Sequence, residues 1–297
     1  MYSMVFAMFK RNEISWLPVA KLSILPLAVA LMLIASSAQA QWTLLDNFEG
    51  LAVGDAIEGS SGPGATWTGN GTSTGTAEID PSDPSNLALR ISGAPSSEVL
   101  RAEFSAQGNS IVAGATGTLF FRFRTPVAAV GGLDHVFGLT DNPTITNFNF
   151  KSGLRYTVPA GVNNLDLRDG INPGYESVAS LADNTWYSLW MVSTNTNPGT
   201  FETYLQSNTD SNFATQTLLT SGGDPFDYRI NGITDITNAY FRSSNNTGGV
   251  EGNDLYFDDI YINSSAVDLS DPLAVPEPTG VVVLLAGMGM VFARRRK

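Results

Sequence analysis

The 297-residue sequence contains no cysteine and a single histidine, His135. The absence of cysteine excludes a disulfide framework, a thiolate metal site and a cysteine nucleophile. A single imidazole also excludes a catalytic zinc site built from several histidines. We therefore expect an apolar core to supply the stability of the protein, helped at most by ions bound to oxygen ligands.

Positive charge is scarce in the long central part of the chain, from Gln41 to Pro272. This part holds 26 acidic and 9 basic residues, a formal charge of −17, and the two ends hold the other seven basic residues. A surface so negative repels nucleic-acid backbones and anionic lipid headgroups. We expect no nucleic-acid partner, whereas divalent cations and neutral or cationic surfaces remain compatible.

Long hydrophobic runs are also missing, and one short run lies near the N-terminus. Three basic residues precede an apolar run over 22–34, which is followed by small residues ending in Ala38-Gln39-Ala40. This order is typical of a secretory signal peptide, and thirteen apolar residues interrupted by a proline are short for a membrane anchor, which is the alternative. We expect residues 1–40 to be a signal peptide and the protein to be exported.

The second short run lies at the C-terminus, where residues 275–297 contain three elements in order. A Pro-Glu-Pro motif precedes an apolar run over 281–292 and a basic end. The motif and the basic end consist of Pro276, Glu277, Pro278, Arg294, Arg295, Arg296 and Lys297. This pattern resembles the PEP-CTERM sorting signal, with an ordinary tail anchor as the alternative.

The PEP-CTERM resemblance has implications for partners and localisation. It implies that a membrane-embedded exosortase recognises the motif and processes the chain. It further implies transient membrane insertion through the C-terminal segment. The host would be a double-membraned bacterium that makes exopolysaccharide, with the protein on the cell envelope surface or in the extracellular matrix.

The central part of the chain shows no long helical periodicity. Short alternating runs are separated by turns rich in Gly, Asn, Asp and Pro, as in antiparallel β-proteins. These patterns predict an all-β, two-sheet antiparallel sandwich as one domain over 41–266, followed by a linker over 267–274. The clearest expected strands cover 87–91, 118–125, 186–193, 201–206 and 255–262.

Three short stretches resemble the concanavalin A-like jelly rolls, which include laminin G-like domains. They are Asp46-Asn47-Phe48-Glu49-Gly50, Asn184-Thr185-Trp186-Tyr187-Ser188-Leu189 and Tyr256-Phe257-Asp258-Asp259-Ile260-Tyr261. Galactose-binding-like sandwiches share the opening and closing patterns. The resemblance implies that the first and last strands pair side by side and that a Trp-Tyr strand packs in the core.

Such pairing predicts a site for a structural calcium ion. It would bring Asp46 and Glu49 close to Asp254, Asp258 and Asp259, and crowded carboxylates are stabilised by a hard cation. Because side chains alternate along a strand, we expect only one of the last two to be a ligand. The preferred ligands are Asp46, Glu49 and Asp259, and the alternative is a set of solvated charges at a sheet edge.

A second set of residues resembles the jelly-roll alginate lyases. It comprises Arg101-Ala102-Glu103, Asp134-His135-Val136 and Phe150-Lys151-Ser152-Gly153-Leu154-Arg155-Tyr156. The resemblance implies that Arg101, His135, Lys151 and Tyr156 neutralise a uronate and move its proton. Asp134 and Arg155 depart from the lyase pattern, and the charge of −17 repels a polyuronate unless the cleft is locally basic.

A glycosidase-like carboxylate strand is a weaker possibility at Glu78-Ile79-Asp80-Pro81-Ser82-Asp83. Pro81 and Pro84 interrupt the alternation that such a strand needs, so we expect a turn there. For glycan binding, Trp67 is the best candidate because it stands among small polar residues in a loop-like stretch. Trp186 and Trp190 lie in an alternating apolar run and are expected in the core.

The sequence thus predicts an exported, exosortase-sorted surface or matrix protein without enzymatic activity, able at most to bind carbohydrate weakly. The alternative is an extracellular polysaccharide lyase or glycoside hydrolase of the jelly-roll type. A purely structural matrix protein is the third possibility.

Overall fold

The computed structural model describes residues 42–70, 75–92, 98–128, 133–142, 150–158, 161–170, 174–221, 225–245 and 254–274. The chain divides into Met1–Ala40 and Gln41–Lys297, and all of the described residues belong to the second unit. The expected signal peptide and sorting signal lie outside the described residues. Within the described ranges, no helix is long and apolar enough to cross a bilayer.

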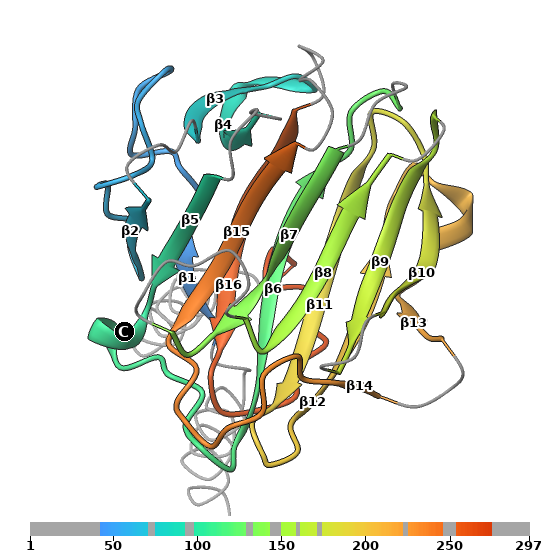
Figure 1. Ribbon diagram of the computed structural model, residues 1–297. Helices are drawn as coiled ribbons and strands as arrows, with labels where there is room; N and C mark the ends of the chain where they lie inside the picture. The colour runs from blue at the N-terminus through green and yellow to red at the C-terminus, as the bar shows by residue number, and fades with distance from the viewer. Residues whose placement is uncertain are drawn as a thin grey trace, which may run out of the picture. The chain divides into compact units, whose positions relative to one another are not determined.

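The described residues form two antiparallel sheets, named sheet A and sheet B (Figure 1). In spatial order, the main path of sheet A is β13 (Thr217–Leu219), β12 (Thr200–Gln206), β11 (Trp186–Thr194), β6 (Thr116–Arg124), β16 (Leu255–Asn263), β4 (Asp83–Ile91) and β3 (Thr76–Asp80). Off this path, β1 (Thr43–Asp46) pairs with β16 and β14 (Phe226–Asp227) with β12. Sheet B runs β10 (Gly174–Leu181), β9 (Asn163–Asp169), β8 (Ser152–Thr157), β7 (Leu133–Thr140), β15 (Asn238–Asn245), β5 (Glu98–Glu103) and β2 (Thr66–Gly69).

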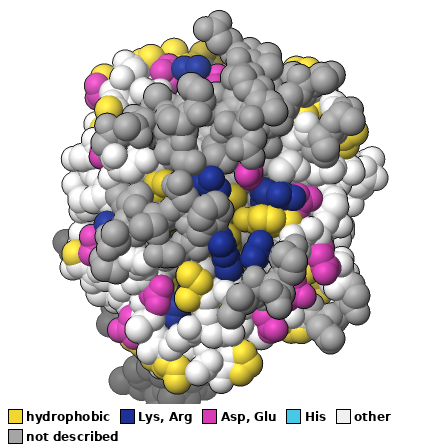
Figure 2. All heavy atoms as spheres, viewed as in Figure 1, with side chains coloured by type: hydrophobic (Ala, Val, Ile, Leu, Met, Phe, Trp, Pro, Cys, Tyr) yellow, Lys and Arg dark blue, Asp and Glu magenta, His cyan; other side chains and the backbone are white. Residues whose placement is uncertain are grey.

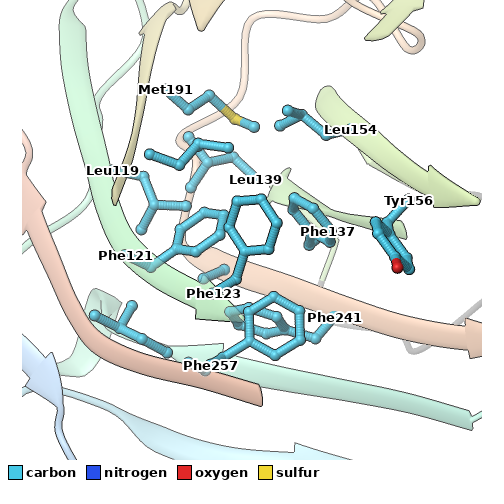
Figure 3. Packing of buried hydrophobic residues seen from close by; sticks show 14 of the residues in the cluster. Leu119, Phe121, Phe123, Phe137, Leu139, Leu154, Tyr156, Met191, Phe241 and Phe257 are labelled. Atoms are coloured by element: carbon cyan, nitrogen blue, oxygen red, sulfur yellow. The ribbon is translucent and has the colours of Figure 1, made fainter. Parts of the chain in front are cut away.

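The core lies between the two sheets because alternate residues of each strand point inward. On β6, Leu119, Phe121 and Phe123 face the core, as the alternation predicts. Aromatic rings from the two sheets meet there: the centroids of Phe121 and Phe137 are 5.5 Å apart, and those of Phe241 and the sheet A residue Phe257 are 5.0 Å apart (Figure 3). Such edge and tilted ring contacts, added to apolar burial, hold the sheets together.

The predicted fold class is confirmed: the domain is an all-β, two-sheet antiparallel sandwich of the jelly-roll type. All five expected strands are present, with ends shifted by at most a few residues. The first and last strands pair, with Thr43 opposite Ile262 and Leu44 opposite Tyr261. The turn expected near Pro81 is also present, since β3 ends at Asp80 and β4 begins at Asp83.

The predicted linker is wrong, because residues 264–274 pack against the outer face of sheet A and form what we call the C-terminal strap. Trp190 and Phe120, whose rings lie 5.0 Å apart, are buried on that face. Trp190 Nε1 donates to the strap carbonyl of Ser270 at 2.9 Å, and Trp42 Nε1 donates to Ser270 Oγ at 3.0 Å. The backbone N–H of Asp268 donates to Thr118 Oγ1 at 3.0 Å. The folded domain therefore extends to residue 274.

Candidate functional site

The residues implied by the lyase resemblance are not brought together. His135 on β7 and Tyr156 on β8 point inward and are buried, with ring centroids 6.2 Å apart. Burial lowers the pKa of His135 to about 3, so the imidazole is neutral, and burial raises the pKa of Tyr156. The Tyr156 hydroxyl donates to Asn163 Oδ1. Both residues belong to the core.

Lys151 is also buried, and its contacts are structural. Its Nζ donates to Asn195 Oδ1 at 3.1 Å and to the carbonyls of Gly232 and Thr234 at 2.7 and 3.0 Å, and it lies 3.5 Å from Asp141. It thus ties the segment before β8 to two distant loops. Of the four implied residues, only Arg101 lies on an outer face, so the structure does not assemble the site of the lyase alternative.

Trp67 is not available to a ligand. It lies on β2 with no solvent exposure, between the rings of Phe48 and Phe241, whose centroids are each 5.7 Å away. Its Nε1 donates to Asp46 Oδ2 at 2.7 Å. The prediction of a glycan-stacking Trp67 is therefore wrong, because residues 66–69 form the edge strand of sheet B and Trp67 points from it into the core. Trp190 is buried as expected, but beneath the strap, and Trp186 is half-buried on the outer face of sheet A.

The predicted calcium ligands do not converge. Asp46 is buried and uses Oδ1 to accept the Phe48 N–H at 2.8 Å, while Glu49 Oε1 accepts the Leu87 N–H at 2.8 Å. Asp259 instead forms an ion pair with Arg122 at 3.1 Å. Within the described part of the chain, no group of three or more His, Cys, Asp or Glu residues could hold a metal ion.

The arrangement of Asp258 and Asp259 corrects the alternation argument. Asp259 has a left-handed φ of 51°, and the pairing of β16 with β6 shifts register between Asp258 and Tyr261. This β-bulge interrupts the alternation, so both carboxylates reach Arg122, at 3.5 and 3.1 Å. An arginine therefore supplies the positive charge that the sequence assigned to calcium.

The outer face of sheet B carries an unusual concentration of positive charge, which we call the basic face. Figure 2 looks onto this sheet and shows basic side chains gathered around an apolar patch. The positive residues are five of the nine basic residues between Gln41 and Pro272. They are Arg101, Arg155, Arg168, Arg229 and Arg242, and the apolar patch includes Val99, Val136, Phe150, Tyr175 and Tyr240.

Strand register builds this face. Arg242 of β15 stands opposite Val136 of β7, which stands opposite Arg155 of β8, which stands opposite Asp166 of β9. A second row, two residues along the strands, includes Tyr240 opposite Arg101 and Tyr175 opposite Arg168. Directly paired residues share a face, so residues from six strands converge although they are far apart in sequence.

Aromatic rings hold several of these arginines. The guanidinium carbon of Arg155 lies 4.0 Å from the Tyr175 ring centre and that of Arg168 lies 5.2 Å from it. Arg229 lies 5.0 Å from the ring centre of Phe150, which packs on Tyr240 with centroids 6.0 Å apart. Cation–π contacts fix the orientation of a guanidinium through its flat face, without using the N–H donors at its edge that bind anions.

The electrostatics of this face favour an anionic ligand. Burial and the nearby charge of Arg168 lower the pKa of Arg229, and burial lowers the pKa of Arg101. A lowered arginine pKa means that the charged form is disfavoured where it stands, so an approaching anion relieves that cost. Acidic residues near this face offset part of the charge: Asp166 pairs with Arg155 at 2.8 Å, Glu103 lies near Arg101, and Asp134 lies near Tyr175.

Comparisons with known proteins find no matching family profile and no matching curated protein. Similar solved structures include a carbohydrate esterase from the Shiga toxin-encoding bacteriophage phi24B, at 17% identity and a TM-score of 0.46, covering 76% of this chain and 100% of that one. Botulinum neurotoxin type C matches at 14% identity and a TM-score of 0.43 over 79% of this chain, which spans 50% of the toxin chain. An endo-beta-1,4-glucuronan lyase from Trichoderma reesei matches at 10% identity and a TM-score of 0.42, covering 75% of this chain and 94% of the lyase. At such values the similarities carry no argument about function.

Proposed function

We propose that the protein is an exported, exosortase-sorted component of the cell surface or extracellular matrix that binds an anionic polysaccharide through the basic face without cleaving it. The observation that carries the binding proposal is the gathering of five arginines on one face of a domain whose formal charge is −17. Elsewhere the surface repels polyanions, so binding is confined to this face.

The chemistry of the basic face suits a chain of acidic sugars. An arginine guanidinium is suited to carboxylates because it can bind one through two parallel N–H bonds. The rings of Tyr175, Tyr240 and Phe150 supply the apolar surface against which sugar rings pack. A polyuronate carries one carboxylate on each sugar, so several carboxylates of one polymer can contact arginines on several strands. Several weak contacts on the same polymer together raise the affinity.

Binding without cleavage is proposed because the residues that the lyase resemblance implies are used in the fold. His135 and Tyr156 are enclosed in the core, and Lys151 is held by two carbonyls and an amide oxygen. A proton-transfer group must reach the substrate, and these three side chains are buried away from solvent.

The double variant Arg168→Gln/Arg229→Gln is expected to weaken binding to alginate and polygalacturonate by roughly 100-fold, since each charged contact contributes about tenfold. The affinity of the unaltered protein should fall as salt is raised. Isothermal titration calorimetry on the mature chain measures both effects. The matched control is Arg90→Gln, which removes one charge from the outer face of sheet A, where Arg90 pairs with Asp254 at 2.7 Å.

Three outcomes would contradict the binding proposal. They are an unchanged affinity in the double variant, an equal loss in Arg90→Gln, and tighter binding to a DNA oligonucleotide than to either polyuronate. Ultraviolet absorbance of unsaturated sugar products gives an independent check. Turnover of alginate by the unaltered protein would contradict the proposal that the polymer is bound without cleavage.

Sorting gives a separate prediction. Because Pro276, Glu277 and Pro278 precede a short apolar run and a basic end, protein released from the surface of the native host is expected to lack the residues beyond this motif. It should also begin at Gln41. Intact-mass spectrometry measures both ends, and a species that still ends in Lys297 would rule out processing.

A further inference from the structure

A pocket on the outer face of sheet A is separate from the basic face, which lies on the other sheet. Its volume is about 190 Å³, and its lining includes Arg122, Trp186, Ser188, Gln206, Asn208 and Asp271. Gln206 of β12 stands opposite Ser188 of β11, which stands opposite Arg122 of β6. The strap closes one side of the pocket through Asp271 and Leu273. Three strands and the strap thus build it.

Several groups that line this pocket are held in place by contacts within the protein. Trp186 Nε1 donates to Ser82 Oγ at 2.9 Å, which fixes the indole at the β3–β4 turn. The guanidinium of Arg122 lies 4.8 Å from the indole ring centre. The strap residue Asp271 is held too, since its Oδ1 accepts the Leu273 N–H at 2.9 Å. A ligand would meet groups that are already positioned, so little ordering entropy opposes its binding.

Three polar side chains that line this pocket remain available. Among the residues that the structure describes, the side chains of Ser188, Gln206 and Asn208 form no hydrogen bond. Together they offer two amides and a hydroxyl, hence both donors and acceptors, in the pocket that the indole of Trp186 also lines. Such a combination of an aromatic surface and convergent amides suits a sugar, whose rings present apolar C–H faces and a rim of hydroxyls.

The local charge selects against an ionic ligand. The charge of Arg122 is already offset by Asp259, which lies 3.1 Å away, and the buried carboxyl of Asp258 lies 3.5 Å from it. An anion would therefore meet Asp271 and a compensated arginine, and a cation would meet the guanidinium that stands against Trp186. An uncharged ligand avoids both costs.

We propose that this pocket binds one residue of an uncharged polysaccharide, with Trp186 as its apolar contact and Ser188, Gln206 and Asn208 as its hydroxyl partners. The site stands without the proposed function of the basic face. If that function also holds, the two opposite faces of the sandwich join an anionic and an uncharged polymer, and that consequence rests on the proposed function.

The test uses the mature chain with cellohexaose, laminarihexaose and maltohexaose as uncharged probes. At least one of them is expected to bind and to change the tryptophan fluorescence. Ser188→Ala/Gln206→Ala should lower its affinity at least tenfold, which corresponds to the loss of two hydrogen bonds. The matched control is Gln107→Ala, an exposed glutamine in the short helical turn Ser105–Gln107, and it should bind like the unaltered protein.

The result separates this proposal from the one for the basic face. Arg168→Gln/Arg229→Gln should leave the uncharged probes bound with unchanged affinity, whatever it does to polyuronate binding. The pocket proposal is overturned if none of the three probes binds at about 20 mM, a concentration that detects even millimolar affinity. It is equally overturned if a probe binds with the same affinity to the Ser188→Ala/Gln206→Ala variant, or if alginate displaces the probe competitively.

Discussion

Removing the C-terminal strap is expected to lower the free energy of unfolding by a large part of its total. The two chains to compare both start at Gln41, and one ends after Asn263 and the other after Ala274. The truncation removes the C-terminal strap, uncovers the buried side chains of Trp190 and Phe120, and leaves Trp190 Nε1 without the Ser270 carbonyl. Burial of each large aromatic side chain contributes about 2 to 3 kcal/mol. With the lost hydrogen bonds, the deficit is roughly 5 kcal/mol, a large part of the total stability of a domain.

Thermal and urea denaturation of the two chains measure this difference. The chain that ends after Ala274 serves as the reference, because it keeps the strap and omits the C-terminal segment beyond it. A midpoint within about 2 °C of the reference would mean that the strap contributes almost nothing to stability and that residues 267–274 are a linker, as the sequence predicts. If the shorter chain is soluble but unfolds less cooperatively, that result would agree with exposure of the apolar outer face of sheet A.

Asp258→Asn is expected to stabilise the protein at pH 8 and to change little at pH 5. The Asp258 carboxyl is almost fully buried, and its burial, together with the charge of Asp259, raises its pKa to about 7. The folded state therefore retains a proton that the unfolded chain, with a pKa near 3.8, has lost. The protonated Asp258 carboxyl contributes fully to the free energy of unfolding below the pKa that this group has in the unfolded chain. That contribution is lost as the pH rises through the folded-state pKa of about 7.

The size of this effect follows from the pKa difference. Between pH 5 and pH 8 the unaltered protein should lose roughly 2 kcal/mol of its free energy of unfolding from this group, or about 5 °C in Tm. An asparagine side chain cannot ionise, so Asp258→Asn should remove that part of the pH dependence. Asn86 Nδ2 donates to Asp258 Oδ2 at 2.8 Å, and an amide oxygen can accept the same bond.

Asp83→Asn is the control, because it is the same substitution at an exposed site on the same sheet. Hydrogen bonds from Ser85 lower the pKa of Asp83, so its titration lies below this pH range. Its curve of Tm against pH should run parallel to that of the unaltered protein from pH 5 to pH 8. If Asp258→Asn also gives a parallel curve, Asp258 does not titrate in this range, and the burial argument fails.

The candidate site depends on strand register, which is why the sequence reasoning missed it. Arg155, Arg168 and Arg242 stand at alternate polar positions of separate strands, so each looks like an ordinary solvent-facing residue. The nearest available signal was the expectation that a polyuronate needs a locally basic cleft in a domain of charge −17. Which strands stand side by side depends on contacts between distant residues, and alternation alone does not specify them.

The errors at Trp67, at the linker and at Asp259 have related physical causes. A tryptophan flanked by small polar residues looks exposed, but the carboxylate of Asp46, brought from another strand, satisfies its indole N–H in the core. A segment without alternation looks like a linker, but backbone groups of the strap bond to side chains on sheet A. A β-bulge at Asp259 then reverses the faces that strict alternation assigns.

By itself, the sequence determined the all-β class, the main strands, the inward face of β6 and the absence of disulfides, because these depend on composition and on local period-two alternation. Its jelly-roll resemblance also implied the pairing of the first and last strands. Only the tertiary structure decided that five arginines share one face, that residues 264–274 cover the other sheet, and that Arg122 neutralises the carboxylates of the last strand. These features join residues far apart in the chain through strand order and register, which the packing of the whole sandwich selects.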